Sequence, residues 1–263
     1  MDTKYSISLP RRPELEHDVD GLTQRDLDFL YRMYDGGLDR YVDRLGQIGF
    51  TDMTFALDAG CGFGQWSIAL TNTCDWVAAV DISHPRTAVA RRIAKQNCVT
   101  NIAFLKTDIE SLPLDSGLVD GVFSYSVVYY SDFEAVVKEW YRVLKPGGRI
   151  YLCTNGLGKY VYDILHNPNA LNRFDVRKYG VRSIVNTLLN RTEDLSPLNG
   201  GRAMTPGKTR TTLAESGFVD IKFGYEGTLS MQSNRPSTKF YNGRYFGLTK
   251  VYEMMARKPD MNP

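Results

Sequence analysis

The residue pattern with the most chemical content is a glycine-rich segment that follows a short apolar run. Positions 55–57 are apolar and lead into Asp58, after which Gly60, Gly62 and Gly64 occupy every second position. Glycine has no Cβ, so the backbone of such a turn can approach a bound molecule closely. A helix that starts after the turn also offers free backbone N–H groups to polar or anionic ligand atoms. The segment therefore predicts a nucleotide-like ligand at the end of a buried strand.

A second acidic residue supports this prediction and narrows the ligand. Asp81 ends the next apolar run about 20 residues after the glycines, where a carboxylate can accept hydrogen bonds from both ribose hydroxyls. The glycines are spaced Gly-x-Gly-x-Gly, whereas dinucleotide-binding strands carry Gly-x-Gly-x-x-Gly. The Asp58 carboxylate would also repel a pyrophosphate, but it suits a ligand with a cationic amino group. An NAD-dependent oxidoreductase is therefore the least favoured class of enzyme.

The elements that position these acids alternate between strands and helices. Apolar runs predict strands at residues 54–58, 76–81, 102–107, 121–124 and 149–153. Periodic apolar residues and capping signals predict helices at residues 23–34, 38–48, 64–73, 85–97, 132–145 and 205–216. Residues 219–225 alternate as a half-exposed strand, and residues 249–257 can close the sheet. Strands that alternate with helices indicate a parallel sheet covered on both faces.

The composition is typical of a soluble globular protein. The 263 residues are 43% hydrophobic and 24% charged, with a net charge of +2. No apolar stretch approaches the ~20 residues that span a bilayer, and no apolar segment of a secretory signal follows the polar start of the chain. The four cysteines and three histidines are dispersed, without a Cys-x-x-Cys pair. We therefore expect a cytoplasmic protein with no metal site, no disulfide framework and no membrane partner.

The run from Asp58 to Gly64 resembles motif I, Asp/Glu-x-Gly-x-Gly-x-Gly, of the class I S-adenosylmethionine-dependent methyltransferases. Three later segments are similar to further motifs of the same family, in the same order: residues 107–113, 142–148 and 213–218. The chain resembles in particular the small-molecule members with a methyltransferase domain of type 11 or 25. The resemblance is strong over residues 54–154 and loose over residues 205–257.

This resemblance implies an α/β fold with a Rossmann-like, mostly parallel seven-stranded sheet. Helices would cover both faces, the last strand would be antiparallel, and a cap would be inserted after strand 5. One structural domain would then consist of four parts. They are an N-terminal arm with helices (1–50), a cofactor-binding core (51–154), an inserted substrate-side cap (155–204) and the C-terminal part of the core sheet (205–263).

The resemblance also implies S-adenosyl-L-methionine as the cofactor. In the family, an acid at the position of Asp58 lies near the methionine amino group, and Asp81 would bind the ribose hydroxyls. Ile82 would pack on the adenine face, Asp108 would lie near the adenine amino group, and the backbone N–H of Ile109 would lie near a ring nitrogen. The implied cofactor-binding residues are Asp58, Gly60, Gly62, Gly64, Asp81, Ile82, Asp108, Ile109 and Ser124.

Several residues near the predicted site have more than one interpretation. Ser124 ends strand 4 and should face the crevice where the strand order reverses. Trp66 and Tyr34 could stabilise the sulfonium cation, although ordinary core packing explains them as well. Tyr129 and Tyr130 follow strand 4, in the region where related enzymes contact the acceptor. The catalytic base is not assigned, because the histidines and tyrosines of loops are mostly surface or packing residues.

The long segment after strand 5 carries the basic excess of the chain. Residues 155–210 hold 9 Lys and Arg against 4 Asp and Glu, and long segments in compact domains often form lids or binding elements. Two interpretations remain open: arginines that bind an anionic acceptor, or a solvated helix face that balances the acidic N-terminal half. The basic residues of the cap are Lys159, Arg173, Arg177, Lys178, Arg182, Arg191 and Arg202.

The predicted function is transfer of a methyl group to an oxygen or nitrogen atom of a small molecule. In one interpretation, this molecule is anionic. A nucleic-acid methyltransferase is less favoured, because residues 125–128 read Tyr-Ser-Val-Val instead of Asn/Asp-Pro-Pro-Tyr/Phe and no dense basic arm is present. A non-catalytic module that keeps the cofactor fold is the other alternative, since cofactor binding and turnover are separable.

Overall fold

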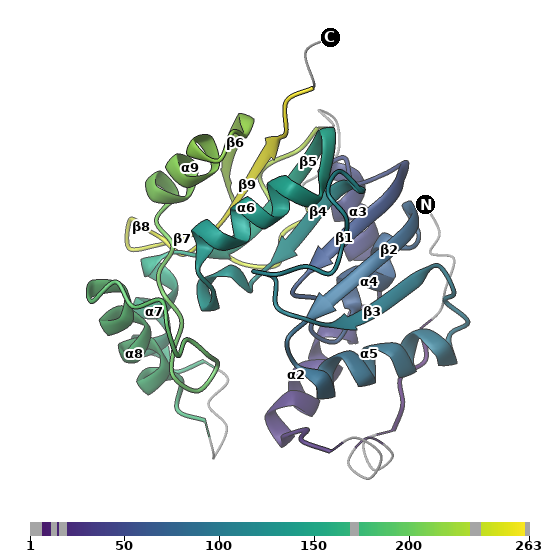
Figure 1. Ribbon diagram of the computed structural model, residues 1–263. Coiled ribbons are helices and arrows are strands. Elements are labelled where there is room, and N and C mark those ends of the chain that lie inside the picture. The colour runs from purple at the N-terminus through teal and green to yellow at the C-terminus, as the bar shows by residue number, and fades with distance from the viewer. Residues whose placement is uncertain (1–6, 12–14, 16–19, 169–173, 232–237, 261–263) are drawn as a thin grey trace.

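The computed structural model describes residues 7–11, 15, 20–168, 174–231 and 238–260, and Figure 1 shows the arrangement of its elements. The main sheet has seven strands in the order β3-β2-β1-β4-β5-β9-β6. Its strands are β1 (Met53–Ala59), β2 (Cys74–Asp81), β3 (Ile102–Lys106), β4 (Val119–Tyr125), β5 (Leu144–Asn155), β6 (Val219–Tyr225) and β9 (Val251–Arg257).

Strands β1 to β5 run parallel to one another, whereas β9 pairs antiparallel with both β5 and β6. The predicted fold class is therefore confirmed, including the antiparallel last strand. The strand order reverses between β1 and β4, and open α/β sheets bind ligands at the carboxyl ends of the strands at such a point.

Helices cover both faces of this sheet (Figure 1). They are α2 (Gln24–Tyr34), α3 (Asp39–Gln47), α4 (Gln65–Leu70), α5 (His84–Gln96), α6 (Phe133–Val143), α7 (Leu157–His166), α8 (Val176–Leu188) and α9 (Pro206–Glu215). The apolar residues of α2 to α5 pack into one core, and those of α6 and α9 pack into a second core on the other face. Burial of both faces explains why the central strands read as continuous apolar runs.

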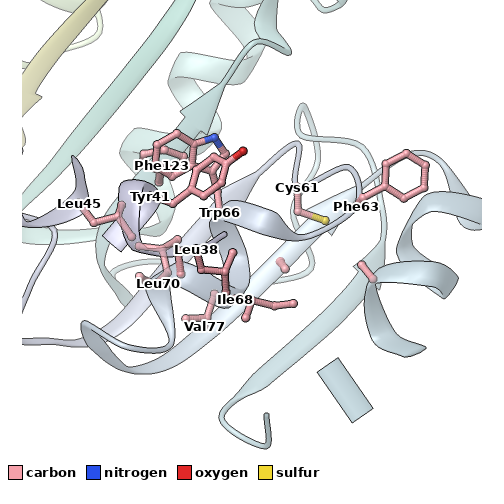
Figure 2. Close-up of a cluster of buried hydrophobic side chains, with 14 of the residues drawn as sticks. Leu38, Tyr41, Leu45, Cys61, Phe63, Trp66, Ile68, Leu70, Val77 and Phe123 are labelled. Atoms are coloured by element: carbon pink, nitrogen blue, oxygen red, sulfur yellow. The ribbon is translucent and has the colours of Figure 1, made fainter. Parts of the chain in front are cut away.

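The core on the first face fixes the helix that follows the glycine turn. Figure 2 shows Tyr41 and Leu45 of α3 beside Trp66 of α4. The rings of Tyr41 and Trp66 meet edge to face at 4.7 Å, and Trp66 also lies 4.8 Å from the ring of Phe123. Aromatic contacts of this kind add to the free energy gained by burial. They hold α4, and hence the turn before it, against the sheet.

Several helices begin at the capping residues that the sequence predicts. Thr23 caps α2 in a capping box with Asp26, and Thr205 caps α9 by accepting from the Lys208 N–H. The predicted strand at residues 149–153 is too short, because β5 already begins at Leu144 and includes the Pro-Gly-Gly turn residues. There Leu144 pairs with Val119, before a register shift.

The segment after β5 holds elements for which the sequence patterns gave no predicted range. It contains two packed helices, α7 and α8, and Figure 1 shows them at the outside of the molecule, near a short hairpin. The hairpin consists of β7 (Arg244–Tyr245) and β8 (Leu248–Thr249). Of the predicted N-terminal arm, residues 1–6, 12–14 and 16–19 lie outside the described residues.

Candidate functional site

The glycine turn between β1 and α4 has the backbone conformation for which glycine is required. Gly60, Gly62 and Gly64 have φ angles of +91°, +53° and +80°, a region that side chains with a Cβ disfavour. A Cβ at Gly60 would lie 2.5 Å from Cγ1 of Val127, whereas a Cβ at Gly62 would meet nothing within 4 Å. The lack of a Cβ at Gly60 therefore lets the Val127 side chain pack closely against the turn, whereas Gly62 borders open space.

Asp81 lies at the end of β2, directly beside this turn. Its Oδ2 accepts from the N–H of Gly62 at 2.9 Å, and its Oδ1 accepts from the N–H of Ser83 at 2.8 Å. Two backbone donors thus hold the carboxylate in one orientation. Each carboxylate oxygen keeps a further lone pair for a ligand hydroxyl, as a ribose-binding residue requires.

Asp58 is buried at the end of β1, and its Oδ2 accepts from the Ser67 hydroxyl at 2.5 Å. Burial raises the pKa of this carboxyl group to about 7; the Ser67 hydrogen bond opposes the shift and the negative charge of Asp81 adds to it. No lysine or arginine among the described residues forms an ion pair with Asp58. A buried carboxylate without a cationic partner fits the ammonium group of S-adenosylmethionine.

The remaining predicted cofactor residues occupy different environments. Ile82 is 67% exposed beside Asp81, so its apolar surface is free to cover a ring. Asp108 is exposed and accepts from the Glu110 N–H, while Ile109 is buried. Ser124 is fully buried and donates its hydroxyl to the Ala59 carbonyl at 2.9 Å, so this side chain joins β4 to β1.

Trp66 and Tyr34 pack as core residues. The Trp66 indole lies among the rings of Tyr41, Phe123, Tyr125 and Phe240 at centroid distances of 4.7 to 5.3 Å. The Tyr34 hydroxyl donates to the Phe63 carbonyl at 2.9 Å and ties α2 to the glycine turn. These contacts favour the packing interpretation that the sequence left open.

Tyrosines gather where the chain leaves β4 and meets the cap. Tyr129 and Tyr130 lie in the 3-10 helix η1 (Val128–Tyr130), and their rings are 4.5 Å apart. The Tyr130 hydroxyl lies 2.9 Å from that of Tyr179 on α8, whose ring is 6.0 Å from Tyr160 on α7. Burial raises the pKa of all four phenols, so they remain neutral at physiological pH. The region after β4 is thus lined by residues of α7 and α8.

One cation of this region was not among the sequence candidates. The Arg25 guanidinium of α2 stacks 3.4 Å from the centroid of Phe174, which precedes α8. Burial lowers its pKa, and the nearby Tyr130 and Tyr179 oppose the shift. The contact joins segments about 150 residues apart, so no local sequence pattern could reveal it.

The basic residues of the cap do not converge on one point. Arg177, Lys178 and Arg191 are exposed, and Arg182 donates to the Leu198 carbonyl at 2.6 Å. Lys159 pairs with Asp163 at 2.5 Å. Arg202 is half-buried and donates to the Ser131 carbonyl at 3.1 Å, whereas Arg173 lies outside the described residues. Most of these cations form a solvated surface.

Two histidines lie at the ends of helices. His84 is exposed at the start of α5, and His166 at the end of α7 stacks on Tyr162.

At the carboxyl end of β4, the Tyr125 hydroxyl donates to buried Glu226 at 3.0 Å. This pair was also missed, because Glu226 follows β6 far along the chain.

Comparisons with known proteins agree with this arrangement. A family model described as a methyltransferase domain matches residues 57–152. A demethylmenaquinone methyltransferase of Mycolicibacterium gilvum is 30% identical over 166 residues, which are 59% of this chain and 68% of that protein. A demethylmenaquinone methyltransferase of Lactococcus lactis is 35% identical over 98 residues, or 36% of this chain and 39% of that protein. The chain thus matches less than half of the Lactococcus relative's length.

Two further similarities extend over more of the chain. An S-adenosyl-L-methionine-dependent Diels-Alderase of Talaromyces variabilis is 30% identical over 199 residues, which are 72% of this chain and 61% of that protein. The fold is similar to that of geranyl diphosphate C-methyltransferase from Streptomyces coelicolor, solved with Mg²⁺, geranyl diphosphate and S-adenosyl-L-homocysteine. The TM-score is 0.56, the identity is 16%, and the match covers 98% of this chain and 92% of that chain.

Proposed function

Because the chain belongs to the class I S-adenosylmethionine-dependent methyltransferases, with S-adenosylmethionine as cofactor, we propose that it methylates an oxygen or nitrogen atom of a small organic molecule. The observation that carries the proposal is the pair of acids at the glycine turn. Asp81 is oriented by two backbone N–H groups, and Asp58 is buried without a cationic partner. Together they match two polar parts of the cofactor, its ribose hydroxyls and its ammonium group.

The residues of the chain mainly have to hold and align the reactants. The cofactor supplies an activated methyl group, so alignment of the acceptor provides much of the reduction of the barrier. Asp81 would hold the ribose, Asp58 the ammonium group, and Ile82 and Asp108 the adenine. The exclusion of water by the helices around the turn would strengthen these polar contacts.

The acceptor would lie between η1 and the cap, beside Tyr129, Tyr130, Tyr160 and Tyr179. Neutral phenols and their rings suit an acceptor with an aromatic or apolar body and one polar end. Arg25 is the cation best placed for an anionic group on such a molecule, because it is half-buried and no ion pair among the described residues engages it. In this proposal, Arg25 rather than an arginine of the cap binds the anionic group of the acceptor.

A second candidate is a cofactor-dependent reaction without methyl transfer. The similarity to the Talaromyces Diels-Alderase favours it, since that match extends over 72% of this chain. Such a reaction would use the same cofactor residues and a shape-selective acceptor site. Only the fate of the methyl group separates the two candidates.

The test is methyl transfer from S-adenosylmethionine with a labelled methyl group into a whole-cell extract. The extract is then separated into small-molecule, nucleic-acid and protein fractions, and the labelled product is identified by mass spectrometry. Asp81→Asn should weaken S-adenosylhomocysteine binding about tenfold to a hundredfold, because hydrogen bonds to a charged acceptor contribute about 1.5–3 kcal/mol. Labelling at limiting cofactor should fall in proportion.

Asp75→Asn is the matched control, because Asp75 lies on the same strand and is exposed. It should leave cofactor binding and labelling unchanged. Label that enters only nucleic acid or protein would contradict the small-molecule proposal. Tight cofactor binding with no label in any fraction would favour the second candidate, and binding of NADH alone would overturn both.

A further inference from the structure

Over its last two turns, helix α8 presents polar side chains to the protein and aliphatic side chains to solvent, whereas Val176 in its first turn is buried. Its inward residues include Ser183, Asn186 and Thr187. The Asn186 side chain donates to the Asn199 carbonyl at 3.1 Å, and the Ala203 N–H donates to the Thr187 hydroxyl at 2.7 Å. Hydrogen bonds to residues 199–203 therefore hold this face inward.

Close packing also fixes the rotation of α8 about its own axis. A Cβ at Gly180 would lie 2.9 Å from Cγ1 of Ile164 and 3.0 Å from the Tyr160 carbonyl oxygen, so α7 and α8 are in direct contact there. On the same side, Ser183 accepts from the Gly201 N–H at 3.1 Å. The outward face is consequently fixed by the fold.

That outward face consists of aliphatic and cationic side chains. Leu188 is 79% exposed and Leu189 is 59% exposed. The helix Val176–Leu188 contains three cations and no acid. The exposed face is made up of Val181, Val185, Leu188, Leu189, Arg177, Lys178 and Arg182.

A surface helix of a globular protein normally has the opposite arrangement, with its apolar stripe toward the core. Leu198, 72% exposed, adjoins the same face, because Arg182 donates to its carbonyl oxygen. Contiguous exposed apolar residues mark interaction surfaces, and aliphatic side chains with interleaved cations are typical of helices that lie on anionic membranes. A second copy of this face would bring like charges together, which disfavours self-association.

We propose that the outward face of α8 docks the protein on an anionic lipid surface. This inference goes beyond the proposed reaction and does not depend on it. It differs from the expectation of no membrane partner, which rested on the lack of a spanning segment. Among the described residues, no helix is long and apolar enough to cross a bilayer, so α8 would lie in the interface plane.

The experiment is co-sedimentation of the full chain with vesicles of phosphatidylcholine alone and of phosphatidylcholine with phosphatidylglycerol. Binding should require the anionic lipid and should weaken with added salt. Arg177→Gln/Lys178→Gln should lower the partition coefficient about thirtyfold, because each cation near an anionic surface contributes about 1 kcal/mol, or about fivefold. Leu188→Ser/Leu189→Ser should lower it on the order of a hundredfold.

Lys208→Gln/Arg210→Gln is the matched control, because these two exposed cations lie on α9. It removes the same charge and should leave binding at more than half of the original value. Circular dichroism and S-adenosylhomocysteine binding verify that each variant is folded. Three outcomes overturn the proposal: no vesicle binding, equal loss in the α9 control, or a dimer in light scattering that Leu188→Ser/Leu189→Ser abolishes.

Discussion

Asp58 is the site residue whose protonation should control cofactor affinity near neutral pH. Its pKa is raised to about 7 without ligand, and a bound ammonium group favours the charged carboxylate. Below pH 7 the proton must leave before the ion pair can form. We therefore expect S-adenosylhomocysteine affinity to rise about tenfold per unit from pH 5 to pH 7 and then to level off.

Calorimetry at pH 5.5, 6.5 and 7.5 would measure this dependence. Asp58→Asn should bind more weakly, with the same affinity at all three pH values. Ser67→Ala should move the change to higher pH, because the Ser67 hydroxyl stabilises the carboxylate. Equal affinity of the unaltered protein at pH 5.5 and 7.5 would contradict the role of Asp58 as the ammonium partner.

The cofactor residues could be predicted because each follows a strand in a short local pattern. The glycines and Asp81 lie within one strand–turn–helix–strand unit, so their spacing along the chain sets their distance in space. Arg25 and Ser67 carry no such pattern. Arg25 contacts Phe174, which lies just before α8 and far along the chain, and the contact of Ser67 depends on the first turn of α4 facing β1.

At the level of elements, the glycine turn allows the structural and ligand-binding roles of two glycines to be separated. Gly60→Ala should lower the free energy of unfolding by about 2–4 kcal/mol, because it combines an unfavourable φ with a clash against Val127. Gly62→Ala should cost only about 1–2 kcal/mol, since its Cβ meets nothing within 4 Å. Urea unfolding without ligand measures both values.

Val127→Ala combined with Gly60→Ala provides the control. The double variant should recover part of the loss, because it removes the methyl groups nearest the new Cβ. Equal destabilisation by the two single alanine variants would show that the close approach at Val127 does not determine the need for glycine at position 60.

The elements predicted correctly are those whose apolar faces point to a core. Helix α6 has buried residues at regular helical spacing, and its predicted position is confirmed. Helix α8 was missed because Ser183 and Asn186 occupy its inward face, so the apolar periodicity points away from the protein. Sequence patterns report apolar faces, and an apolar face need not be a buried one.

At the scale of the whole molecule, the N-terminal helices are joined to the cofactor turn. Tyr34 of α2 donates to the Phe63 carbonyl at 2.9 Å, and the ring of Phe29 lies 6.1 Å from that of Phe63. Arg86 of α5 pairs with Asp26 of α2 at 2.7 Å. Opening of α2 would therefore release the turn that holds the ligand.

This connection predicts that cofactor binding protects α2 from hydrogen exchange. At a ligand concentration of 100 Kd, binding stabilises the ligand-bound, closed state by about 2.7 kcal/mol. Amides that exchange only when the protein opens and releases the ligand should therefore exchange up to about a hundredfold more slowly. Amides of residues 24–34 should slow with S-adenosylhomocysteine, whereas those of α9, which packs on α6 and β6 instead, should not. Tyr34→Phe should reduce the protection of α2 and leave α9 unchanged. Protection of α9 equal to that of α2 would mean that the ligand stabilises the whole sheet uniformly, contrary to this prediction.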